Sequence, residues 1–217
     1  MTDVDRMSEK LIIGMILRAF PGHSILSEES PPVDSGSRYR WIIDPIDGTT
    51  NFAHAFPFFC VSIALEESGK VILGVVYDPM RNEIFTAEKG KGAALNGKKI
   101  GVSRVGSLGG SFLATGFSYG ITGKDRNIEY FRKLLVKAQA IRRAGSAALD
   151  LCYVACGRFD GFWEMNLHPW DVAAASLIVG EANGKVTKFD GKPYCHYDKN
   201  ILATNGHIHN QMISSLL

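Results

Sequence analysis

The chain has 217 residues, of which 46% are hydrophobic and 21% are charged, and its formal net charge is +2. This balance is typical of a globular protein with a sizeable core and argues against a disordered chain. A net charge so close to zero, without a long basic stripe, gives no support to nucleic-acid binding, and no apolar run is long enough to cross a bilayer.

The first half of the chain is expected to combine one helix with several strands. Residues 7–20 have the periodicity of an amphipathic helix, which a Pro-Gly pair ends, with apolar side chains at Leu11, Ile12, Met15 and Ile16. β-prone segments then follow at 40–44, 61–65, 71–77 and 83–87, and the Gly-, Asn- and Lys-rich segment 89–99 is typical of a hairpin. We therefore predict an α+β unit over residues 1–107.

In the second half of the chain, strands alternate with helices. Strands are predicted at 112–115 and 140–143, and helices at 127–138, 146–156 and 172–183. Such alternation indicates an α/β arrangement, so we predict an α/β unit over residues 108–217.

The densest chemical signal is the segment WIIDPIDGTTNF at residues 41–52. A hydrophobic strand delivers Asp44 at its end, and Asp47 follows at a tight turn. Gly48 permits close backbone approach, and Thr49 can begin a helix. Carboxylate oxygens are ligands that Mg²⁺ prefers, and the N–H groups at a helix N-terminus favour phosphate. The segment therefore suits a site that holds a metal ion and a phosphate together.

Each acidic element in this region also has a simple structural interpretation. Asp-Pro and Asp-Gly are common turn dipeptides, although the whole string after a buried strand favours a site. Glu28 and Glu29, in an upstream loop, could be a solvated charge pair. Asp171 precedes an Ala-rich helix, where an N-cap is the simplest interpretation. Sequence spacing does not place Asp171 beside Asp44.

The cysteines, two adjacent arginines and three histidines give weaker evidence for a site. The four cysteines lack the C-x-x-C spacing of a zinc site, and free thiols together with a polar N-terminal segment favour a cytoplasmic protein. Arg142 and Arg143 are neighbours on a predicted strand, so at most one of them faces a site. His168 is taken as a loop histidine, and His207 and His209 as an incidental exposed pair.

Together these motifs resemble the inositol monophosphatase family. The resemblance extends over nearly the whole chain, and its motifs begin at Glu28 (EES), Asp44 (DPIDGTTNF), Gly90 (GKGA), Gly145 (GSAA) and Trp170 (WDVA). It implies a layered α-β-α-β-α sandwich of the inositol monophosphatase and fructose-1,6-bisphosphatase type, which usually forms a homodimer. It also implies an enzyme, a phosphoric monoester hydrolase that acts on inositol monophosphate.

The resemblance further implies two or three Mg²⁺ ions and inhibition by lithium. The expected ligands of the first two ions are Glu28, Asp44, the carbonyl of Ile46, Asp47 and Asp171, with Asp44 shared between the ions. A third ion, held mostly by water, is expected near Glu28. One ion would lower the pKa of the attacking water and another would stabilise the leaving oxygen.

The resemblance also implies roles around the substrate. Thr49 and Glu28 are expected to orient the attacking water, so that no phospho-enzyme forms, and the N–H groups of Gly48 and Thr49 are expected to hold the phosphate. Contacts with the substrate are expected from Asp171, Glu164, Gly145, Ser146 and Ala147. Ser146 is also expected to be a helix N-cap.

Other functions remain open at this stage. Related enzymes hydrolyse fructose 1,6-bisphosphate, nucleotide 3′-phosphates or histidinol phosphate, whereas Thr50-Asn51-Phe52 is most similar to the inositol type. A regulatory protein with little turnover, in contact with the transcription machinery, is the alternative from another class. The complete acidic set favours catalysis, because clustered carboxylates are costly without a cation. The family has a helix and a mobile loop before the element at residues 2–5, and this chain, which begins at Met1, is expected to lack that segment. The resemblance therefore does not extend to the affinity for the third ion or to the rate of turnover.

Overall fold

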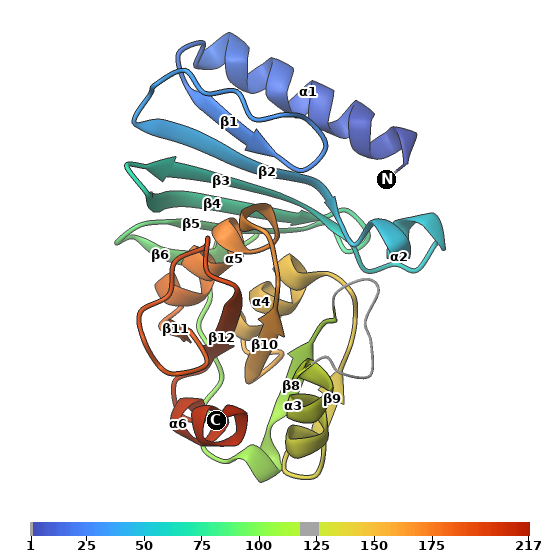
Figure 1. The fold of residues 1–217 in the computed structure, drawn as a ribbon, viewed down its shortest axis with the longest axis vertical. Helices are drawn as coiled ribbons and strands as arrows, with labels where there is room; N and C mark the ends of the chain where they lie inside the picture. Colours follow the sequence, from blue (N-terminus) through green and yellow to red (C-terminus); the bar gives the residue numbers. More distant parts are fainter. Residues whose placement is uncertain (1, 118–125) are drawn as a thin grey trace.

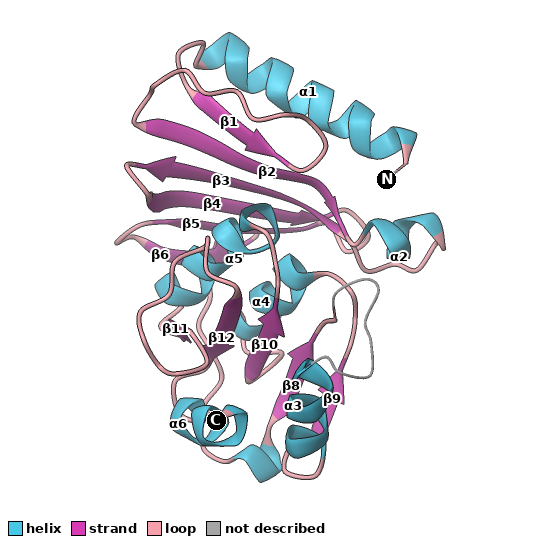
Figure 2. Cartoon of the chain, viewed as in Figure 1, coloured by secondary structure: helices cyan, strands magenta, loops and turns pink. Residues whose placement is uncertain are grey.

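The computed structural model describes residues 2–117 and 126–217. Helices and sheets alternate in layers, in the order α-β-α-β-α (Figures 1 and 2). Helix α1 forms one outer layer, α4 and α5 lie between the two sheets, and α3 and α6 cover the far side of the second sheet. The helices are α1 (Asp3–Ala19), α2 (Thr49–Ala53), α3 (Arg126–Leu135), α4 (Ala147–Ala155), α5 (Pro169–Glu181) and α6 (His209–Leu216). The predicted layered fold is confirmed.

The first sheet follows the order of the chain. Its strands are β1 (Ser24–Ser27), β2 (Tyr39–Asp47), β3 (Cys60–Glu67), β4 (Lys70–Asp78), β5 (Glu83–Glu88), β6 (Gly92–Leu95) and β7 (Lys98–Lys99). Strands β1 and β2 are parallel, and every later pair is antiparallel. In β3 the side chains alternate between buried and half-buried, as expected for a strand whose two faces meet different layers. The strands predicted for the first half, including the hairpin, are confirmed.

The second sheet is mixed, with the order β11-β12-β10-β8-β9. Its strands are β8 (Phe112–Thr115), β9 (Ala140–Arg142), β10 (Gly161–Met165), β11 (Lys185–Thr187) and β12 (Asn200–Thr204). The pairs β8–β9 and β8–β10 are parallel, because a helix returns the chain between their strands. The first sheet ends at Lys99 and the second begins at Phe112, so the predicted division at residues 107/108 lies in the segment between them.

Helix α1 is confirmed, but its predicted packed face is partly wrong. Leu11 and Met15 are 65% and 63% exposed, whereas Ile16 packs with Ile25 and Ile43 of the first sheet. The helix begins with a capping box in which the Thr2 hydroxyl accepts from the Asp5 N–H. No helix in the described part of the chain is both long and apolar enough to cross a membrane.

Helices α4 and α5 are apolar on nearly all sides because each has a sheet on either side. Small side chains let α5 approach the first sheet closely at Gly74 of β4. A Cβ atom built on Gly74 would lie only 2.6 Å from the backbone oxygen of Ala174. The absence of a side chain at Gly74 therefore sets the distance between α5 and the sheet.

Gly74→Ala is accordingly expected to destabilise the protein by about 1–3 kcal/mol, because neither backbone can yield without shifting a whole element. Gly180→Ala in α5 is the matched control: nothing lies within 4 Å of its Cβ position. That variant should gain about 0.5–1 kcal/mol from helix propensity. Urea unfolding of both variants measures the difference, and equal stabilities would contradict this account of the packing.

Candidate active site

A cavity of about 710 Å³ opens where β2, α2, α4, β10 and α5 meet. Every residue that the sequence analysis assigned to a site lines it: Glu28, Asp44, Ile46, Asp47, Gly48, Thr49, Gly145, Ser146, Ala147, Glu164 and Asp171. The lining comes from both halves of the chain, so the cavity exists only once the central helices have packed between the sheets.

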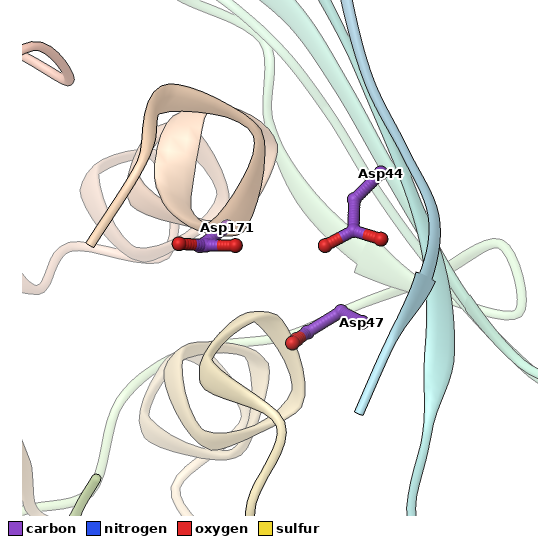
Figure 3. Close-up of side chains that lie close together, drawn as sticks. All are labelled: Asp44, Asp47 and Asp171. Carbon is purple, nitrogen blue, oxygen red and sulfur yellow. The ribbon is translucent and has the colours of Figure 1, made fainter. Parts of the chain in front are cut away.

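Three carboxylates converge in this cavity. Oxygen atoms of Asp44, Asp47 and Asp171 all lie within 4.8 Å of one another, and Figure 3 shows the three side chains directed towards a common space. Residues three apart on a regular strand would face opposite sides. The pairing of β2 with β3 shifts register between Asp44 and Asp47, and this irregularity allows both side chains to face the cavity.

Asp171 is brought to the cluster by the first turn of α5. The N-cap of α5 is His168, so the interpretation of Asp171 as an N-cap is wrong. Asp171 is the third helical residue, and its Oδ2 accepts a hydrogen bond from the His168 N–H at 2.7 Å. Pro169 at the first helical position favours this start. The bond fixes the Asp171 side chain at the end of the helix that faces Asp44.

Asp47 is held by the N-terminus of α4. Its Oδ2 accepts hydrogen bonds from the Ser146 hydroxyl at 2.6 Å and from the Ala148 N–H at 2.7 Å. Ser146 in turn accepts from the Leu149 N–H, so the predicted N-cap is confirmed. These contacts join the strand end of the first sheet to a central helix.

Burial is the largest cause that raises the pKa values of the three carboxylates. Burial, opposed by hydrogen bonds from Ser146 and the α4 backbone, raises the pKa of Asp47 to about 6. Burial and the neighbouring charge of Asp47 raise the pKa of Asp171 to about 8. The pKa of Asp44, which is fully buried beside Asp47 and Glu28, lies well above its usual range. A bound cation would offset this repulsion.

Glu28 stands at the more exposed edge of the cluster. It lies outside the group of three close carboxylates but lines the same cavity and hydrogen-bonds Asp44. Partial burial is the largest cause that raises its pKa to about 7. The donors gathered here are all carboxylate oxygens, which suit a hard divalent cation rather than zinc.

The turn between β2 and α2 forms another wall. Gly48 has φ +95°, a left-handed conformation that favours glycine, and a Cβ there would lie 3.1 Å from the Phe58 oxygen and 3.2 Å from the Gly145 oxygen. The Thr49 hydroxyl lies 3.0 Å from the Ile46 oxygen and 3.2 Å from Asp5 Oδ1. Because this hydroxyl donates one hydrogen, a lone pair remains free to accept another.

A model of the Inositol monophosphatase family matches the chain over residues 1–217. The chain belongs to the inositol monophosphatase family. The Nus factor SuhB of Pseudomonas aeruginosa is 47% identical, and the match covers 88% of this chain and 72% of that protein. The inositol-1-monophosphatase of Synechocystis is 46% identical, with 99% and 76% covered. The structure of inositol monophosphatase from Anabaena has a TM-score of 0.91 at 46% identity, with 98% and 85% covered. The chain is therefore a phosphatase.

In this inositol monophosphatase family member, sequence analysis missed Asp150 and left open which of the two adjacent arginines faces a site. Asp150 and Arg143 both line the cavity, and Arg142 instead stacks over Phe112 at 4.8 Å. The prediction that at most one of the two arginines faces a site is therefore confirmed. Asp150 follows Ala147 by three residues, so helical periodicity places both on one face of α4. That spacing was the signal that could have identified Asp150.

Three histidines of this family member differ in their exposure to solvent. His168 lies on the cavity wall and is exposed, stacked on Trp170 with ring centroids 4.8 Å apart. The prediction of an exposed pair is wrong for His209, which is buried and bonds the Thr187 and Thr204 hydroxyls at 2.9 Å and 2.8 Å. His207 is exposed as predicted. His209 therefore has a structural role that joins α6 to the second sheet.

Proposed function

We propose that this phosphatase hydrolyses a phosphorylated polyol, with inositol monophosphate as the expected substrate, in a Mg²⁺-dependent reaction. The observation that carries the proposal is the convergence of Asp44, Asp47 and Asp171 in one cavity that also contains Glu164. The cluster suits a hard cation, and a carboxylate such as that of Glu164 suits hydroxyl groups. The relative named inositol-1-monophosphatase, at 46% identity, supports the same substrate class.

The residues that would hold the metal are those of the acidic cluster. Asp44 would be shared between two Mg²⁺ ions, with Asp47 and Asp171 on one side and Glu28 and the Ile46 carbonyl on the other. When bound, Mg²⁺ supplies positive charge that acidifies the attacking water and neutralises the leaving oxygen. A third ion near Glu28 and inhibition by lithium are further parts of this proposal.

Side chains and backbone groups of the protein would orient the water, accept its proton and hold the phosphate. The Thr49 hydroxyl donates to the Ile46 oxygen, so its lone pair can accept a hydrogen of the attacking water and fix its orientation. Glu28, at the exposed edge of the cluster, can accept the proton as the water oxygen bonds to phosphorus. The N–H groups of Gly48 and Thr49 would hold the phosphate oxygens while the bond to the polyol oxygen breaks.

Thr49→Ala is expected to lower kcat about 100-fold, because the water would lose its orienting acceptor. Thr49→Ser keeps the hydroxyl and is the matched control, with a kcat within a few-fold of the native value. Steady-state phosphate release measures both. Equal losses in the two variants would show that Thr49 acts through its packing rather than through its hydroxyl.

The proposed function is tested by phosphate release from a panel of esters, with and without Mg²⁺. The panel contains inositol 1-phosphate, fructose 1,6-bisphosphate, a nucleoside 3′,5′-bisphosphate and histidinol phosphate. Mg²⁺-dependent release with inositol 1-phosphate preferred is the expected result. Preference for another ester would assign a different substrate to the enzyme. No release from any ester by folded, Mg²⁺-saturated protein would overturn the proposed activity.

A second role, contact with the transcription machinery, is supported by the name of a relative that is 47% identical, Nus factor SuhB. We propose it as an addition to catalysis, because the acidic cluster is complete. Copurification with a transcription elongation complex tests it. A homodimer and a cytoplasmic location stay predictions from the sequence.

A further inference from the structure

One buried carboxylate in the cavity wall has no role in the chemistry described above. Asp150 lies on α4, is 1% exposed and lines the cavity. Its Oδ1 has no hydrogen-bond partner within the described residues. Buried carboxylate oxygens are nearly always paired, because leaving one unpaired forfeits its interaction with water. Because Asp150 lines the cavity, its unpaired oxygen indicates a partner that the chain itself does not supply.

The surroundings of Asp150 indicate the chemistry of that partner. Glu164, 7% exposed on β10, lines the same cavity and acts on Asp150 through its charge. Arg143 also lines the cavity. Burial raises the pKa of both acids, and the charge of Arg143 opposes this rise only in part. Two carboxylates thus accompany one guanidinium in this wall. Because carboxylates accept hydrogen bonds and repel anions, such a wall favours a neutral donor over a second phosphate.

The position of the Glu164 carboxylate depends on a glycine. A Cβ built on Gly116 would lie 2.2 Å from Glu164 Oε2, so the Glu164 carboxylate occupies the place that a side chain at position 116 would take. The adjacent Phe117 also lines the cavity, and its carbonyl accepts a hydrogen bond from Arg143 at 3.4 Å. The absence of a side chain at Gly116 therefore leaves room for the Glu164 carboxylate on the cavity wall.

We propose that Asp150 is a specificity-determining residue, whose unpaired oxygen accepts a hydrogen bond from a hydroxyl of the polyol beside the hydroxyl contacts of Glu164. The inference rests on the proposed function and names a recognition element of the same site. It predicts that Asp150 discriminates polyol esters from esters whose leaving group has no additional hydroxyl. A ligand without such a donor would leave the buried Asp150 oxygen unpaired. Its transition state would therefore bind less tightly than that of a ligand with a donor.

The test compares two substrates of the intact chain, inositol 1-phosphate and p-nitrophenyl phosphate. The measured quantity is the ratio of their kcat/KM values. Asp150→Leu, which keeps the approximate side-chain volume but removes both acceptors, is expected to lower this ratio at least tenfold. Asp150→Asn keeps one acceptor oxygen and should give an intermediate ratio. An unchanged ratio in folded Asp150→Leu protein would overturn the proposal.

Two further measurements separate recognition from folding. Cys152→Ala, which removes a buried side chain from the same helix, is the control for general disturbance of α4 and should keep the native ratio. The Tm of Asp150→Leu and Asp150→Asn should not fall, because each replaces a buried carboxyl whose Oδ1 has no hydrogen-bond partner. A loss of Tm with a parallel loss of activity on both esters would assign Asp150 a structural role and overturn the proposal.

Failure of the proposed function is distinguishable from failure of this inference. If native protein releases phosphate from neither ester, the proposed function fails, and calorimetric titration with free myo-inositol then tests Asp150 without turnover. Binding that is at least tenfold weaker in Asp150→Leu would support the inference. Equal binding by both proteins, or no binding by the native protein, would overturn it.

Discussion

Asp44→Asn is expected to lower Mg²⁺-dependent phosphate release on the order of 10³-fold, the largest effect of any single substitution in the site. Asp44 is fully buried between Glu28 and Asp47 and is the one acid proposed to contact both metal ions. The charge stabilisation that a metal supplies is worth several kcal/mol, and each 1.4 kcal/mol corresponds to about a tenfold change in rate. Loss of the shared ligand would remove much of that stabilisation.

The same substitution should not unfold the protein. The Asp44 Oδ1 accepts a hydrogen bond from the Ile46 N–H at 3.0 Å, and the amide oxygen of asparagine can still accept it. Removal of a charge from among repelling carboxylates should leave the metal-free Tm equal or higher. Low activity at an unchanged Tm is therefore the expected combination.

Asp190→Asn is the control for the removal of one carboxylate charge. Asp190 lies on an exposed turn, paired with Lys192 at 3.0 Å, and does not line the cavity. Its activity should equal that of the native protein. Native-like phosphate release by Asp44→Asn with saturating Mg²⁺ would contradict the assignment of Asp44 as a metal ligand.

The second large effect is expected in the pH dependence of stability. The pKa values of Asp47, Asp171 and Glu164 are raised to about 6, about 8 and about 8, in each case mainly by burial. A carboxyl with a raised pKa binds its proton more tightly in the folded than in the unfolded state. Its stabilising contribution is complete below the unfolded pKa, about 4, and is lost as the pH rises through the folded value. Metal-free protein should therefore become less stable between about pH 4 and about pH 8.

Mg²⁺ should reverse this loss, because it binds the deprotonated carboxylates in competition with protons. At about 100 times its Kd, a ligand stabilises the folded state by about 2.7 kcal/mol, which for a chain of this size raises Tm by roughly 5–10 °C. We expect such a rise near pH 8 and a much smaller one near pH 5, where the cluster is largely protonated.

Thermal unfolding at several pH values, in EDTA and in Mg²⁺, measures both effects. NaCl at equal ionic strength controls for general screening of charge. The Mg²⁺-induced rise should be reduced in Asp44→Asn, which links it to the cluster. A metal-free Tm that increases towards pH 8, or a Mg²⁺ effect of equal size at all pH values, would contradict the electrostatic account of the site.

Local sequence signals predicted much of the fold. Alternating and amphipathic patterns located strands β2 to β5 and helices α3 to α5, since periodicity and turn residues act over short distances. Strands β10 to β12 and helix α6 were not predicted. The buried residues of β10 and β12 are nearly continuous, and such runs do not distinguish a strand from a helix. Strand β11 has three residues and α6 has eight, which is too short for a clear periodic signal. The packed face of α1 was misjudged because its stripe contains more apolar residues than the sheet covers.

Within the site, the local sequence encodes the segment between Asp44 and Thr49: a strand end, a glycine turn and the start of a short helix. The other acids of the site are brought to this segment by long-range packing. Asp171, Glu164 and Asp150 reach the cavity because α4 and α5 pack between the two sheets and the α4 N-terminus binds Asp47. This packing depends on shape at contacts such as Gly74 against Ala174, between residues a hundred positions apart, and no local pattern encodes the distance across such a contact.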